Sequence, residues 1–222
     1  MGDSLHAVLR VLHMGGAYLA FGAAPLALLA VKGGRRHILA GGSFALGMGI
    51  SAIAGVLLTL PPDLPLLFRA LVVLFLTGTG YLAPRVGRGS RAGYGWDRAL
   101  TAVGGIASAG LVYDGLSRLT VATLTGTDMI LGVLGLSVAA AHSRWRGHAD
   151  PARWRVEHLT SFLAAYTVAC MFLAFFYLPM LPSAVRSLIP AVLGCAAILW
   201  ARRRFGGPRS RQPSAVALTG AA

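Results

Sequence analysis

The chain has 222 residues, of which 56% are hydrophobic and only 12% are charged, whereas about 25% of residues are charged in an average soluble domain. Its mean hydropathy is +0.69 and its net charge is +13. This composition argues against a soluble enzyme and predicts an integral membrane protein whose cations gather in cytoplasmic loops. No basic arm interleaved with aromatic residues is present in the sequence, so nucleic acid is not an expected partner.

Seven apolar runs follow one another along the chain, each long enough to cross about 30 Å of hydrocarbon as a helix. The first is too long for a cleaved signal peptide and contains Pro25, the fourth and fifth are interrupted near Asp114 and Asp128, and the seventh contains Pro190. We therefore expect an all-α integral membrane bundle of about seven transmembrane helices in one domain, 1–204, followed by a disordered cytoplasmic tail, 205–222. The approximate runs are 5–31, 39–60, 64–84, 99–117, 121–142, 157–177 and 184–201.

The cations are distributed unequally between the two ends of these runs. The loops after the first, third and fifth runs, together with the segment after the seventh, hold sixteen of the twenty Lys and Arg residues. By the positive-inside rule this predicts an N-terminus outside and a C-terminus in the cytoplasm. Lys32 is the one lysine in an arginine-rich chain, a bias typical of a GC-rich bacterial source, so the expected location is the bacterial inner membrane.

Ionisable side chains at membrane depth are costly and mark functional positions. Six such side chains are expected near the outer ends of the helices. Three of them, His6, Arg10 and His13, lie at i, i+4 and i+7 on one helical stripe. The six form either a proton relay or polar substrate pocket, or simple ion pairs such as Asp114 with Arg118. The six residues are His6, Arg10, His13, Arg69, Asp114 and Asp128.

A second group consists of histidines near the cytoplasmic ends of several helices: His37, His142, His148 and His158. Neutral imidazole is a common metal ligand and an axial ligand of haem. The group therefore predicts haem b or a transition metal ion, bound by His37 and His158 with His142 or His13 as further ligands. The alternative is that these histidines are interfacial anchors. His6 and His13 share one helix and cannot both ligate one haem in a monomer.

Several short motifs resemble a family of bacterial multi-span membrane proteins of unknown function. The motifs are His13, the loop K-G-G-R-R-H from Lys32 to His37 with Gly41 after it, and the segment W-R-x-E-H ending at His158, followed by Tyr166. The resemblance implies an all-helical inner-membrane protein and singles out His13, His37 and His158. The chain departs from the family at Ile38, where arginine is usual, and at Ser161–Phe162, which replaces a methionine region.

Four functions are compatible with these features. The leading hypothesis is a membrane protein that binds haem or a metal ion for redox or electron transfer, within a lipid bilayer and with a redox partner or a second copy of itself. The alternatives are a small-molecule or proton-coupled transporter, and a membrane-embedded lipid or isoprenoid enzyme or an accessory factor. No P-loop, H-E-x-x-H or G-x-S-x-G motif occurs in the sequence, which argues against a hydrolase or a nucleotide-driven protein. Whether the protein is an enzyme of another kind is left open.

Overall fold

The structure, a computed structural model, describes residues 3–59, 63–117, 126–145 and 151–205. The described residues form seven α-helices and no strand, which confirms the all-α prediction. The expected tail and His148 lie outside the described residues, as does Arg118. The helices are α1 (Asp3–Leu29), α2 (Arg35–Leu58), α3 (Leu64–Val86), α4 (Arg91–Ser117), α5 (Thr127–Trp145), α6 (Pro151–Tyr177) and α7 (Ser183–Phe205).

Among the helices that begin earlier than the apolar pattern predicts, α4 and α6 differ most from it. The pattern places these starts near residues 99 and 157, but α4 begins at Arg91 and α6 at Pro151. Ser90 stabilises the start of α4, because its Oγ accepts a hydrogen bond from the Gly93 N–H at 3.1 Å. Pro151 is the first residue of α6, a position where the N–H that proline lacks would have no intrahelical partner. The extra turns consequently bring Asp97 into α4 and place Glu157 inside α6 instead of at its first residue.

Six of the seven described helices are long and apolar enough to cross a membrane, and the chain is therefore a multi-pass helical membrane protein. The exception is α5, whose 19 residues include Asp128, His142 and Arg144. Large apolar side chains such as Val11 and Ile106 are each 71% exposed, which suits contact with lipid.

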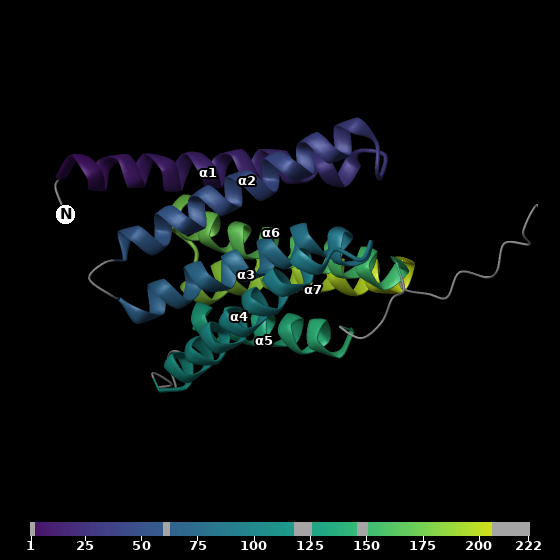
Figure 1. Cartoon of the computed structure of the whole chain (residues 1–222). Helices are drawn as coiled ribbons and strands as arrows, with labels where there is room; N and C mark the ends of the chain where they lie inside the picture. Colours follow the sequence, from purple (N-terminus) through teal and green to yellow (C-terminus); the bar gives the residue numbers. More distant parts are fainter. Residues whose placement is uncertain (1–2, 60–62, 118–125, 146–150, 206–222) are drawn as a thin grey trace, which may run out of the picture.

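The core surrounds α3, which packs against α2, α4 and α6. The side chains of Val72, Phe75 and Leu76 on this helix are fully buried. Figure 1 shows successive helices running back and forth, with the N-terminus at one end and the α1–α2 connection at the other. Because of this alternation, the start of α2, the end of α3 and the start of α6 lie at the same end of the bundle.

The helices α1 and α2 form a hairpin at the edge of the bundle, and α1 packs mainly against α2 (Figure 1). The two helices touch closely where Gly16 faces Gly47, and a Cβ added to either glycine would come within 2.6 Å of the other's carbonyl oxygen. Small residues at such crossings allow membrane helices to approach closely. The connecting turn uses Gly33 with a φ of 80°, a left-handed conformation that glycine adopts without strain.

Candidate functional site

The structure brings together two histidines that lie 121 positions apart in the sequence, His37 at the start of α2 and His158 near the start of α6. Their ring centroids are 6.3 Å apart, and the ring planes meet at 74°. We call these two residues the histidine pair. The pair joins the α1–α2 hairpin to the rest of the bundle.

The end of α1 positions the His37 ring. The last four carbonyl groups of a helix lack intrahelical partners, and α1 ends at Leu29. The Nδ1 of His37 lies 2.9 Å from the carbonyl oxygen of Ala27, which is one of these groups. The tight turn through Gly33 returns the chain so that the first turn of α2 can reach this oxygen.

A proline in α3 positions the His158 ring. Pro84 lies inside α3 and has no N–H to donate to the carbonyl of Gly80, four residues earlier. The Nδ1 of His158 lies 2.7 Å from that carbonyl oxygen. Gly80 also allows α6 to approach, because a Cβ at this position would come within 2.6 Å of the Phe162 ring. The sequence thus removes one helical hydrogen bond and uses the freed oxygen to hold a histidine.

The two hydrogen bonds define which tautomer each ring has when it is neutral. A carbonyl oxygen only accepts, so Nδ1 carries the hydrogen and donates in each case. The lone pair of each neutral imidazole is therefore on Nε2. Within the described part of the chain, neither Nε2 has a hydrogen-bond partner. Histidines that ligate metals usually hold their second nitrogen in this way.

Aromatic side chains from α1, α2 and α6 adjoin the histidine pair on its membrane side. The Phe162 ring lies 4.7 Å from the His158 ring and 5.1 Å from the Phe44 ring, measured between centroids. Tyr166 continues this layer, with Phe21 at 5.7 Å. The pair therefore lies beside a packed aromatic layer of the apolar core.

His142, which the sequence groups with the histidine pair, lies instead between two carboxylates. Its Nε2 donates to Asp97 of α4 at 2.7 and 2.8 Å, and its Nδ1 is 3.6 Å from Oε2 of Glu157 of α6. All three side chains are fully buried, and the Trp154 ring packs edge-on against His142. We call Asp97, His142 and Glu157 the buried triad. It joins α4, α5 and α6 next to the histidine pair.

His13 is also anchored but lies in another part of the hairpin. Its Nδ1 is 2.8 Å from the carbonyl oxygen of Ser51, which is fourteen residues beyond His37 on α2. At the helical rise per residue this separation is about 21 Å. His13 and the histidine pair therefore do not form one ligand set.

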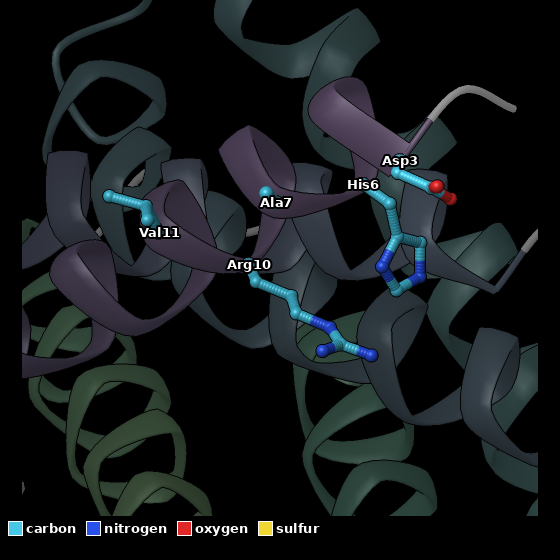
Figure 2. Close-up of a pocket in the computed structure, with 5 residues that line it drawn as sticks. All are labelled: Asp3, His6, Ala7, Arg10 and Val11. Atoms are coloured by element: carbon cyan, nitrogen blue, oxygen red, sulfur yellow. The ribbon is translucent and has the colours of Figure 1, made fainter.

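The predicted outer residues separate into smaller groups. Arg69 of α3 and Asp128 of α5 form a two-bonded ion pair at 2.5 and 2.7 Å, and Asp114 is close enough for its charge to act on Arg69. Two further residues of the predicted group, His6 and Arg10, lie on the first turns of α1. Figure 2 shows them on one side of a surface recess with Asp3.

Comparisons of the chain with known proteins give no indication of its function, which leaves the geometry of the site as the main guide. No known family model, curated protein or solved structure matches the chain. The family resemblance based on His13, the Lys32–His37 loop and the His158 segment therefore stays a prediction. Among the residues that the structure describes, no three His, Cys, Asp or Glu side chains form a cluster suited to a metal ion.

Four residues that shape these sites are not among the predicted site residues: Gly80, Pro84, Asp97 and Glu157. Pro84 could have been found, because a proline four residues after a glycine in an apolar run always frees that carbonyl. The two carboxylates gave no such signal. They lie sixty positions apart. Asp97 precedes the helix start predicted near residue 99, and Glu157 coincides with the helix start predicted near residue 157.

Proposed function

We propose that the protein binds haem through His37 and His158 and takes part in electron transfer within the membrane. The observation that carries this proposal is the matched geometry of the two rings. Each donates Nδ1–H to a main-chain carbonyl and keeps its Nε2 lone pair for a ligand. The two ring centroids are 6.3 Å apart, so that His37 and His158 would be the residues to hold the group.

The number of ligands favours haem over a bare transition ion. Protein sites for such ions use three or four side chains, and the described residues contain no cluster of three. Haem would need only two ligands from the protein, and His37 and His158 would supply them. The aromatic layer of Phe44, Phe162 and Tyr166 makes the membrane side of the pair apolar.

The chain's own groups have three tasks in this proposal. The Ala27 and Gly80 carbonyls fix the tautomer and direction of the two imidazoles. Their hydrogen bonds increase the electron density at Nε2, which strengthens it as a ligand. Phe162, against the His158 ring, limits access of water from the membrane side. Haem, when bound, supplies a one-electron redox couple whose potential these groups tune.

The test is a visible spectrum of the purified protein, oxidised and reduced, before and after reconstitution with haemin. We expect a Soret band and the low-spin signature of two nitrogen ligands in the wild type. His37→Ala and His158→Ala should each lose the low-spin signature, since each removes one axial ligand.

His6→Ala is the matched control, because His6 lies near the N-terminus of α1 and outside the pair (Figure 2). Its spectrum should equal that of the wild type. Wild-type protein that stays colourless after reconstitution, or His37→Ala and His158→Ala spectra indistinguishable from it, contradicts the proposal.

A further inference from the structure

Lys32, the one lysine of the chain, is held beside the histidine pair. Its Nζ donates to the carbonyl oxygens of Leu28 at 2.6 Å and Ala27 at 3.2 Å. The Ala27 oxygen is the same acceptor that holds the His37 ring. The ammonium is also close enough to the His158 ring for its charge to act there. Lys32 therefore shares an acceptor with His37, and its charge acts on His158.

The ammonium group keeps a donor for a further partner. A lysine ammonium has three N–H donors, and the two helix carbonyls use two of them. No carboxylate of the described residues forms an ion pair with Lys32. Partial burial lowers the pKa of Lys32, because desolvation disfavours the charged form. An anion placed here would offset that cost.

We infer that Lys32 determines which ligand the histidine pair accepts, by binding a carboxylate on the ligand's edge. This inference rests on the proposed function. It specifies the ligand class as a metal macrocycle with free peripheral carboxylates, such as haem with its two propionates. The Lys32 ammonium would hold such a ligand by a charge-assisted hydrogen bond to one carboxylate.

A purely structural role is the competing explanation, since a lysine near the C-terminus of a helix also stabilises its free carbonyls. The two roles differ in their dependence on the ligand. A helix-ending lysine affects every ligand of the site equally, whereas a carboxylate partner affects only ligands that carry a free carboxylate.

The experiment compares haemin with haemin dimethyl ester, in which both propionates are esterified, as ligands of apo-protein in neutral detergent. Wild type, Lys32→Gln, Lys32→Arg and Arg35→Gln are titrated and followed by the Soret band. Arg35→Gln is the matched control, because it removes the same charge from an exposed residue about 200° around α2 from His37.

We expect Lys32→Gln to weaken haemin binding about tenfold, the value of one charge-assisted hydrogen bond. Lys32→Arg and Arg35→Gln should stay within about twofold of the wild type. The dimethyl ester should bind wild type and Lys32→Gln equally. Thermal melting of each apo-protein checks that the variants remain folded.

Equal weakening of both ligands by Lys32→Gln, or no weakening of haemin, overturns the inference and leaves the proposed function standing. A wild type that binds neither ligand overturns the proposed function itself. The same titration in detergent supplemented with phosphatidylglycerol separates a lipid headgroup from a propionate. If Lys32→Gln reduces retention of this lipid and leaves haemin affinity unchanged, Lys32 binds lipid phosphate and the inference fails.

Discussion

At the scale of single residues, two carbonyl oxygens explain the direction of both histidine rings. One is free because α1 ends, and the other is free because Pro84 has no N–H. A main-chain carbonyl on a packed helix is a rigid acceptor, so each ring is held without a dedicated side chain. Ordinary helix-ending and helix-breaking features thus position His37 and His158.

Pro84→Ala tests this explanation for His158. Alanine restores the N–H that bonds the Gly80 carbonyl, so the histidine must compete for its acceptor. We expect haemin affinity to fall about threefold to tenfold, the value of one hydrogen bond, while the melting temperature is unchanged or rises, because alanine favours a helix interior. Haemin titration and thermal melting measure the two effects.

Pro190→Ala makes the same chemical change in α7, away from the histidine pair. It should leave haemin affinity at the wild-type value. An equal loss of affinity in Pro190→Ala and Pro84→Ala would attribute the effect to general helix straightening and contradict the explanation.

At the scale of secondary-structure elements, the buried triad and the glycine crossing determine how helices pack. Asp97, His142 and Glu157 connect α4, α5 and α6 through fully buried polar groups. Gly16 and Gly47 bring the backbones of α1 and α2 into contact. Together these contacts determine how α2 and α6, the helices that carry the histidine pair, pack against their neighbours.

His142→Ala should destabilise the protein strongly. Removing the imidazole leaves the carboxylates of Asp97 and Glu157 buried without their shared partner, and breaking a buried pair in this way costs about 3–5 kcal/mol. The free energy of unfolding in detergent measures this loss. Arg144→Ala, at an exposed position of the same helix, should change it by less than about 0.5 kcal/mol.

Glu157→Gln provides a second test, with a smaller expected loss of stability. Both carboxyl oxygens of Glu157 are buried and, within the described chain, have no hydrogen-bond partner. Neutralising this group removes a desolvation cost, so Glu157→Gln should be far less destabilising than His142→Ala. Equal losses in the two variants would contradict this account of the triad.

Gly47→Ala tests the crossing of α1 and α2. The added Cβ meets backbone atoms of Gly16 and Ala20, which cannot move without separating the helices. Overpacking of this kind costs about 1–3 kcal/mol, seen as a lower melting temperature. Gly49→Ala is the control on the same helix, because a Cβ there meets nothing within 4 Å; it should not lower the melting temperature.

At the scale of the whole molecule, alternating helix directions gather the histidine pair, the buried triad and Lys32 at one end of the bundle (Figure 1). The charge distribution predicts that this end faces the cytoplasm. In the proposed function, the ligand therefore lies near the cytoplasmic surface, within reach of a soluble electron donor or acceptor.

Single cysteines test this orientation in a background where Cys170 and Cys195 are replaced by serine. Asp63→Cys and Arg88→Cys place thiols at exposed positions near the opposite ends of α3. A membrane-impermeant maleimide should label Asp63→Cys on intact cells and Arg88→Cys only after lysis. The reverse pattern would invert the predicted topology and place the histidine pair on the outer side.

The sequence by itself determined the all-α class, the membrane environment, the approximate helices and the choice of His37 and His158 as residues of interest. The class, the environment and the helices follow from composition and from local apolar runs, which a sequence displays directly. The choice of the two histidines followed from their places at helix ends and from the family resemblance, and their role stays a prediction. Only the tertiary structure decided that these two rings meet, that His142 joins two carboxylates, and that His13 lies elsewhere. The physical reason is that such contacts depend on which helices pack together and at which depth, and residues 45 to 121 positions apart carry no local pattern that encodes their meeting.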